Sequence, residues 1–145
     1  MGGPARIGNK KYQEFDNFYP CEFYMDGILW KSSEQYFQAQ KCNDGKYQLK
    51  IHQTMNASEA WSEGQKCPLR EDWENIKYQI MFRANMAKIS QNSGLVEVLI
   101  KTDGDISVNR STPFWNDANA CILEQIRDIF RILRWKTTKL KEGEI

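Results

Sequence analysis

Apolar side chains recur along much of this chain at the spacing of helix faces. The clearest run lies in residues 69–90, where the apolar positions are Trp73, Ile76, Ile80, Ala84 and Ala87. Intervals of three and four residues are typical of a helix with one buried face. The predicted first turn also holds three acidic residues, which the helix dipole favours there: Glu71, Asp72 and Glu74.

Both ends of the chain are polar. Residues 1–11 predict a flexible, basic lead, and residues 136–145 predict a frayed, charged tail. Residues 12–135 contain no linker-like stretch, so we expect them to form one compact domain. Its last helix is predicted over residues 118–134, with Asp117 as a candidate N-cap.

Local signals predict a hairpin followed by a short helix. Asp26-Gly27 separates two apolar and aromatic runs, which is typical of a type I′ turn. Ser32 or Ser33 is then expected to cap a helix, and Ser32 with Gln35 predicts a capping box.

Two further short helices are predicted, at residues 56–64 and 94–100. Asn56 or Ser58 is expected to cap the first one, and Gly64 to end it. A turn and a short strand are expected within "TDGDISVN". The whole pattern indicates an α+β fold that is mainly helical, with a small β-hairpin or sheet, and it argues against a βαβ array or a sandwich.

Bulk composition narrows the function classes. The 145 residues carry a net charge of +1, which gives no basis for nonspecific binding to nucleic acid or membranes. A local pocket for a small nucleotide is compatible with this balance. No run is long and apolar enough to span a bilayer, and residues 1–11 lack the apolar core of a signal peptide. We therefore expect a soluble, cytoplasmic protein without a membrane partner.

Cysteine and histidine are too scattered for a zinc site. The four cysteines form no CxxC pair, and His52 is the one histidine. We therefore expect no metal and no cofactor, and free thiols in a reducing compartment. The signatures of P-loop, dinucleotide and zinc-protease sites are absent as well.

The segment "SSEQYFQAQK" carries the first candidate site. In a helix, Glu34, Gln38 and Lys41 lie on one face. They form either a solvated surface or the polar wall of a site beside Trp30. The helix dipole would stabilise the charge of Glu34 near the N-terminus, whereas enclosure by aromatic rings would oppose it.

Two loops add amides and rings: Asn17, Phe18 and Tyr19 in "FDNFYP", and Trp115, Asn116 and Asp117 in "STPFWNDANA". Each loop is either a ligand wall that offers stacking and hydrogen bonds or an anchor of the core. Arg70 is suited to bind a phosphate or a carboxylate, and Asp72 lies two residues away. More often, however, such residues form the charged first turn of a helix.

Taken together, these segments resemble the NADAR (YbiA-like) family in order and spacing, from about Phe15 to Arg131. The most specific piece is "SSEQYFQAQK", followed by "DWE…K…M…AK…QN" and then "FWND". The resemblance implies a compact α+β domain that handles ADP-ribose-like ligands or ribosylated nitrogens. It also implies N-glycosidic cleavage, on phosphorylated riboflavin-pathway intermediates in one branch and on ADP-ribosylated guanine in another.

On this resemblance, Glu34 matches the motif glutamate. It would stabilise the oxocarbenium-like transition state or activate water. Lys41 would hold phosphate, or attack the anomeric carbon of an opened sugar to form an imine. Trp115 would be a ring wall of the catalytic site. The expected ligand contacts are Asn17, Phe18, Tyr19, Trp30, Gln38, Arg70, Asp72, Asn116 and Asp117.

Residues 105–118 depart from the pattern acidic–x–x–Trp–Gly–x–Gly of many relatives. Thr112 and Ser107 stand where that pattern has acids, and Asp105 or Asp117 would have to substitute. The sequence therefore supports two hypotheses. The first is an N-glycosyl hydrolase acting on a nucleotide or an ADP-ribosylated base, and the second is a catalytically weakened ADP-ribose-binding module. A helical interaction domain without a small ligand is a third interpretation, which the intact Glu34 motif disfavours.

Overall fold

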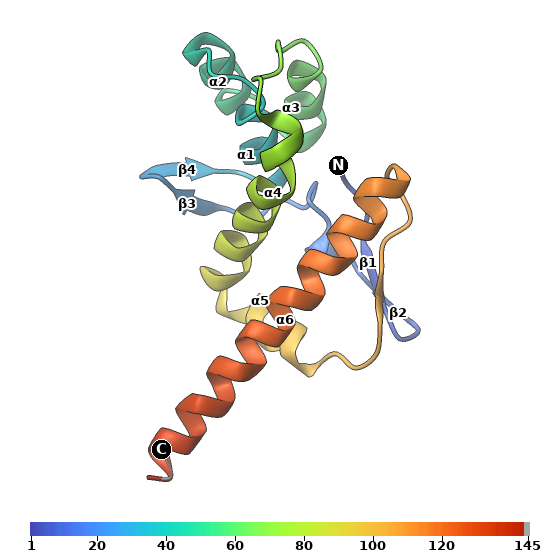
Figure 1. Cartoon of the computed structure of the whole chain (residues 1–145), viewed down its shortest axis with the longest axis vertical. Helices are drawn as coiled ribbons and strands as arrows, with labels where there is room; N and C mark the ends of the chain where they lie inside the picture. The colour runs from blue at the N-terminus through green and yellow to red at the C-terminus, as the bar shows by residue number, and fades with distance from the viewer. Residues whose placement is uncertain (144–145) are drawn as a thin grey trace.

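The computed structural model describes residues 1–143 (Figure 1). The helices are α1 (Ser33–Ala39), α2 (Gly45–His52), α3 (Ala57–Gly64), α4 (Trp73–Ser90), α5 (Ser93–Lys101) and α6 (Pro113–Lys141). The strands are β1 (Ala5–Ile7), β2 (Lys10–Tyr12), β3 (Phe23–Met25), β4 (Ile28–Trp30) and β5 (Ile106–Ser107), with a 3-10 turn η1 (Gln13–Phe15). The predicted α+β fold, mainly helical, is confirmed.

Helix α1 lies at the centre of a four-helix cluster. It packs against α2, α3 and α4, and Figure 1 shows α1, α2 and α3 gathered at one end of α4. Strands β2, β1 and β5 form an antiparallel sheet, and β5 packs against α6. Because α1 is surrounded, every residue of the helix is buried, including its polar ones.

The predicted hairpin and helix cap are largely confirmed. Strands β3 and β4 pair in antiparallel fashion, and Asp26 and Gly27 have φ values of 56° and 77°, as a type I′ turn requires. Ser32 Oγ accepts the Gln35 N–H at 3.1 Å. The capping box is wrong in its second half, because Gln35 Oε1 accepts from the Lys31 N–H at 2.8 Å. Asn56 caps α3, as expected.

Residues 1–11 were expected to be a flexible lead, but they contribute β1 and most of β2. Local sequence does not reveal this, because Arg6 and Ile7 pair with Ser107 and Ile106 from the other end of the domain. The domain limits of residues 12–135 therefore stay a prediction.

The long helices begin elsewhere than expected. Helix α4 starts at Trp73, so Glu71 and Asp72 precede it instead of lying in its first turn. Helix α6 starts at Pro113, where proline is well accommodated, and Thr112 Oγ1 caps it by accepting the Trp115 N–H at 3.4 Å. The predicted N-cap at Asp117 is therefore wrong.

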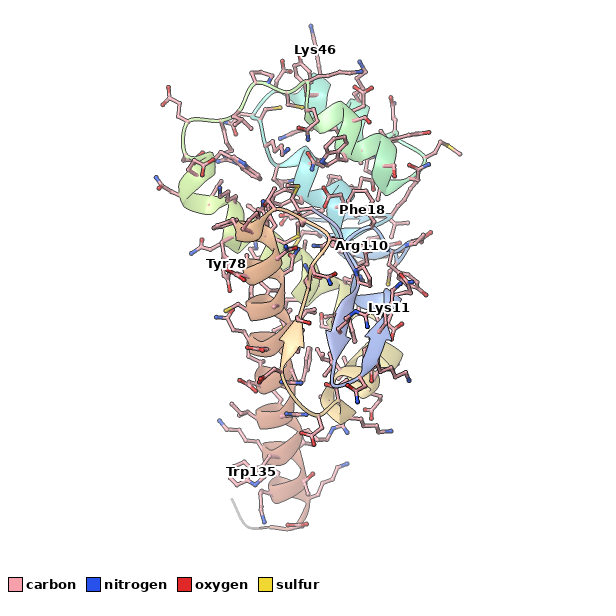
Figure 2. All side chains as sticks on the ribbon, turned by 90° about the vertical axis from the view of Figure 1, so that its right-hand side faces the viewer. Lys11, Phe18, Lys46, Tyr78, Arg110 and Trp135 are labelled. Atoms are coloured by element: carbon pink, nitrogen blue, oxygen red, sulfur yellow. The ribbon has the colours of Figure 1, made fainter. Side chains whose placement is uncertain are left out.

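Helix α6 continues to Lys141 through most of the predicted frayed tail; residues 144–145 of that tail lie outside the described part. This end extends beyond the packed body, with Trp135 near its tip (Figure 2), so its apolar residues are exposed: Ile132, Leu133, Trp135 and Leu140. Within residues 1–143, none of the helices combines the length and apolarity needed to cross a membrane.

Candidate functional site

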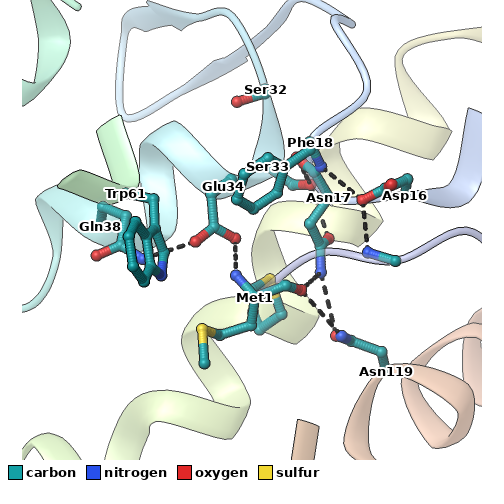
Figure 3. A network of polar contacts seen from close by, with 12 residues as sticks. Met1, Asp16, Asn17, Phe18, Ser32, Ser33, Glu34, Gln38, Trp61 and Asn119 are labelled. Carbon is teal, nitrogen blue, oxygen red and sulfur yellow. Dashed lines mark hydrogen bonds and ion pairs between the residues drawn. The ribbon is translucent and has the colours of Figure 1, made fainter. Parts of the chain in front are cut away.

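The Glu34 carboxylate is the centre of the candidate site. Glu34 lies in the first turn of α1, its backbone N–H donates to the Asn17 carbonyl at 3.1 Å, and its side chain is fully buried. Gln38 Nε2 donates to Glu34 Oε1 at 2.6 Å (Figure 3). The other carboxylate oxygen, Oε2, forms an ion pair with the α-ammonium of Met1. A buried carboxylate is thus held between an amide and a positive charge.

Residues 1–3 lie along this site and are held by side-chain hydrogen bonds (Figure 3). The Met1 carbonyl accepts from Asn17 Nδ2 at 3.0 Å and from Asn119 Nδ2 at 3.1 Å. The Gly3 N–H donates to Asp16 Oδ1 at 2.8 Å. Burial lowers the pKa of the Met1 amine, and the Glu34 charge opposes this shift. The segment therefore occupies space that faces the carboxylate.

A cavity of about 250 Å³ adjoins this segment. It is lined by Gly2, Gly3, Asp16, Phe18 and Arg110. Figure 2 shows Phe18 and Arg110 close together on one face of the molecule. The half-buried Phe18 and the exposed Arg110 thus line the same cavity next to residues 1–3.

Asn17 joins four parts of the chain. Its Oδ1 accepts from Ser33 Oγ at 2.8 Å and from Asn85 Nδ2 at 2.9 Å, and its Nδ2 also reaches Asn119 Oδ1 at 3.1 Å. All four side chains are buried. Asn17 therefore holds the loop onto α1, α4 and α6, beside its contact with Met1.

Lys41 is brought to the Glu34 site, as the sequence predicted. It lies just beyond the end of α1 and is half-buried, and burial lowers its pKa while the Glu34 charge opposes that shift. Its Nζ lies 5.9 Å from the Phe37 ring centroid. Glu34 and Gln38 thus share one face of α1, and Lys41 follows the end of the helix, where its charge interacts with that of Glu34.

Trp115 is buried behind this region, in the first turns of α6 and not in a loop as expected. Its ring lies 5.0 Å from that of Phe37, and the Phe37 ring is also 5.0 Å from Trp73. Trp115 therefore supports the helix that carries Glu34 through an aromatic cluster. Direct contact of Trp115 with a ligand stays a prediction.

Trp30 and Tyr19 lie apart from the Glu34 carboxylate. The buried Trp30 ring packs against Tyr36 at 5.3 Å and His52 at 5.2 Å, and it lines a different cavity of about 510 Å³. Tyr19 is exposed, with Lys88 Nζ 5.7 Å from its ring. Neither is brought to the Glu34 cluster.

Arg70 and Asp72 form an ion pair of 2.6 Å at the edge of a cavity of about 540 Å³. The Arg70 backbone N–H donates to the Lys41 carbonyl at 2.8 Å, so this pair adjoins the Lys41 side of the site. The Arg70 guanidinium holds the pKa of Asp72 below its ordinary value. In this structure Arg70 binds a carboxylate, and its binding to phosphate stays a prediction.

Asn116 and Asp117 are adjacent in the chain but lie in different environments. Asn116 closes the turn before α6, since its side chain bonds both the N–H and the carbonyl of Ser111, at 2.8 and 3.2 Å. Asp117 is exposed, and so is Asp105. Neither carboxylate lies in the buried network around Glu34.

Sequence reasoning missed three buried polar residues of this site. Asn85 and Asn119 hold Asn17, and Lys88 Nζ donates to the Asp16 carbonyl at 3.0 Å. Burial lowers the pKa of Lys88 to about 8. The available signal was that Asn85 and Lys88 adjoin the apolar stripe of the helix on which they lie. The sequence did not single out Asp16 either. In the structure its carboxylate interacts electrostatically with the Met1 ammonium.

A metal-binding role has no support in the side chains. Within residues 1–143, no group of three or more His, Cys, Asp or Glu side chains is arranged to hold a metal ion. The chemistry available to the site is that of a buried carboxylate, an amide, a lysine amine and nearby rings.

Comparisons with known proteins agree on one family. The sequence profile of the NADAR domain matches residues 6–118. N-glycosidase YbiA of Escherichia coli (strain K12) is 39% identical over 93 residues, which make up 63% of this chain and 58% of YbiA. An N-glycosidase of Nostoc punctiforme is 34% identical over 112 residues, covering 72% of this chain and 71% of that protein. The sequence match to YbiA thus spans less than two thirds of the length of that relative.

Two further similarities bear on function and fold. A riboflavin biosynthesis protein of Vibrio vulnificus is 34% identical over 106 residues, which are 70% of this chain and 29% of that protein. The NMR structure of E. coli YbiA matches the fold with a TM-score of 0.79 at 29% identity, covering 86% of this chain and 81% of YbiA.

Proposed function

Because the chain belongs to the NADAR domain family, we propose that it hydrolyses the C–N glycosidic bond of a ribosylated or ADP-ribosylated nitrogen. The names of its relatives, two N-glycosidases and a riboflavin biosynthesis protein, support this reaction class. The observation that carries the proposal is the fully buried Glu34 carboxylate, against which the structure holds a positive charge.

The proposed reaction needs a negative charge beside the sugar. As the C–N bond breaks, its electrons go to the leaving nitrogen and the ribose ring becomes oxocarbenium-like. Glu34 stabilises that cation or takes a proton from the attacking water. The water oxygen then bonds to the anomeric carbon, and the leaving nitrogen gains a proton. Burial strengthens this interaction because surrounding water no longer screens it.

Asp16 is a better candidate than Asp105 or Asp117 for a second carboxylate. It acts on the same Met1 ammonium as Glu34, while Asp105 and Asp117 are exposed. Its Oδ1 accepts the N–H groups of Gly3 and Phe18, at 2.8 and 2.9 Å. Asp16 thus remains close to the proposed sugar position although Thr112 and Ser107 stand where relatives carry acids.

A ligand that reaches Glu34 has to displace residues 1–3. These residues occupy the carboxylate, the Asn17 amide and the Asn119 amide. Once they leave, the same groups become available to the hydroxyls of a ribose. The cationic sugar would then take the place of the Met1 ammonium beside the Glu34 carboxylate.

The second candidate function is a binding module with weakened catalysis. Thr112 caps α6 and Ser107 pairs with Arg6, so both positions that carry acids in relatives have structural roles here. A third route, in which Lys41 forms an imine with an opened sugar, draws support from its lowered pKa, which favours the neutral amine.

The deciding experiment compares wild type with Glu34→Gln. Both are incubated with ADP-ribosylated guanine DNA and with phosphorylated riboflavin-pathway intermediates, and the released base or sugar is quantified. Release by wild type that falls at least about 100-fold in Glu34→Gln supports the hydrolase. Calorimetric binding of ADP-ribose without release supports the binding module. Neither release nor binding overturns both.

A further inference from the structure

The end of α3 makes an unusually close contact with a side chain of the candidate site. Gly64, the last residue of α3, lies against Gln38 of α1. A Cβ placed on Gly64 would lie 1.9 Å from Gln38 Oε1 and 2.7 Å from Gln38 Cδ. Real Cβ atoms do not approach other atoms this closely, so any larger residue at position 64 displaces the Gln38 amide.

Backbone conformation does not explain the glycine. Gly64 is helical, and it is not among the residues with positive φ. Alanine is preferred over glycine in a helix by roughly 1 kcal/mol. The contact with Gln38 is therefore the feature that calls for a missing side chain at this position.

The orientation of the Gln38 amide follows from Glu34. Gln38 Nε2 donates to Glu34 Oε1 at 2.6 Å, which leaves Gln38 Oε1 buried without a hydrogen-bond partner. Rotating the amide by half a turn would place two oxygens against each other. A buried acceptor without a donor is unfavourable. The amide therefore keeps its hydrogen bond to Glu34 at the cost of leaving its own Oε1 without a donor.

We propose that Gly64 is a positioning residue: its missing side chain lets α3 lock the Gln38 amide, and that amide sets the orientation of the Glu34 carboxylate. The catalytic consequence rests on the proposed function, in which Glu34 faces the reacting sugar. The structural coupling between Gly64 and Gln38 is independent of the proposed function, and it is measured separately.

Trp61 lies on the same side of α3 as Gly64. It precedes Gly64 by three residues, so the two share one helix face. The side of α3 that faces the site therefore presents an aromatic ring, then a glycine that admits the amide.

A double-mutant cycle tests the coupling. The variants are Gly64→Ala, Gln38→Ala and the pair together, with Gly94→Ala in α5 as the matched control, because no atom lies within 4 Å of its added Cβ. We expect Gly64→Ala to lower the Tm by roughly 5 °C in the wild type and to change it much less in the Gln38→Ala background, where the amide is gone and only the 3.1 Å approach to the Cβ of residue 38 remains. Equal Tm changes in both backgrounds would overturn the proposal.

Folding failure is also informative. If Gly64→Ala does not fold but the double variant does, the collision with Gln38 is the cause, as proposed. If both fail, position 64 acts through something other than Gln38 and the proposal is wrong. The side-chain amide resonances of Gln38 in NMR spectra give a second readout. They should move in Gly64→Ala and stay unchanged in Gly94→Ala.

The catalytic consequence is read from the two kinetic constants. If wild type releases a base, Gly64→Ala should lower kcat at least tenfold and change KM less than threefold, while Gly94→Ala matches wild type. A KM effect without a kcat effect overturns the positioning role. If wild type releases nothing, the proposed function has failed, and the double-mutant cycle still decides whether Gly64 controls Gln38.

Discussion

Two cavity regions of the molecule differ in their chemistry. One holds the buried Glu34 carboxylate, with residues 1–3 packed along it and only about 250 Å³ of open cavity beside them. The other is lined by Trp30, His52 and Leu49 and measures about 510 Å³. The larger and more apolar cavity lies away from the buried carboxylate. The Glu34 region is the candidate site because of its buried charge and the partners of that charge, and not because of its cavity volume.

The largest expected difference between the regions is in activity. Glu34→Gln should abolish base release, by at least about 100-fold, because the amide cannot stabilise a cationic sugar as a carboxylate does. His52→Gln changes the second cavity and should leave release within twofold of wild type. Rates measured under single-turnover conditions check both. A strong loss in His52→Gln with an active Glu34→Gln would reverse the assignment of the two regions.

The second cavity should matter for stability instead. Trp30→Ala removes a buried ring packed against Tyr36 and His52, and it should lower the free energy of unfolding by about 3–5 kcal/mol. Urea denaturation measures the loss. If the folded fraction of Trp30→Ala also loses more than tenfold in activity, the two regions are coupled more closely than their geometry indicates.

The buried Lys88 should give the Glu34 region a signature in the pH dependence of stability. Burial lowers the pKa of Lys88 from 10.5 to about 8, while Cys21, Asp16 and Glu14 oppose the shift. Between these two values the unfolded chain binds more protons than the folded chain, so stability rises with pH. Relative to Lys88→Met, wild type should gain up to about 3 kcal/mol between pH 8 and 10.5.

This gain is measured by urea denaturation at several pH values. Lys50→Met is the matched control, because the Lys50 side chain is 60% exposed and pairs only at the surface. Parallel curves for wild type and Lys88→Met across this pH range would show that Lys88 titrates normally and is more hydrated than the structure indicates.

The smallest expected effect concerns residues 1–3. A Cβ on Gly2 would lie 2.5 Å from Phe18 Cδ1, so Gly2→Ala should loosen the segment that faces Glu34. Weaker competition by that segment should tighten ADP-ribose binding by about 3- to 10-fold in calorimetry. Gly45→Ala is the control, since nothing lies within 4 Å of its Cβ. Unchanged affinity would mean that residues 1–3 do not compete with the ligand.

Local interactions account for what the sequence predicted well. The Asp26-Gly27 turn and the Ser32 and Asn56 caps depend on residues at most four positions apart, and the structure confirms them. The grouping of Glu34 and Gln38 on one face follows from helix geometry in the same way, whereas Lys41 lies just beyond the end of the helix. The segment "SSEQYFQAQK" was informative because the contact between Glu34 and Gln38 lies within one helix.

The sequence by itself thus determined the helices, the hairpin and the polar face of α1. The tertiary structure decided that this face is buried, that residues 5–12 join a sheet with β5, and that Trp30 points to a different cavity. It also decided that Asn17 contacts Asn119 and that Gly64 meets Gln38. These contacts join residues 26 to 102 positions apart, and no local propensity encodes them, because they form only when separate helices and strands bury their apolar faces together.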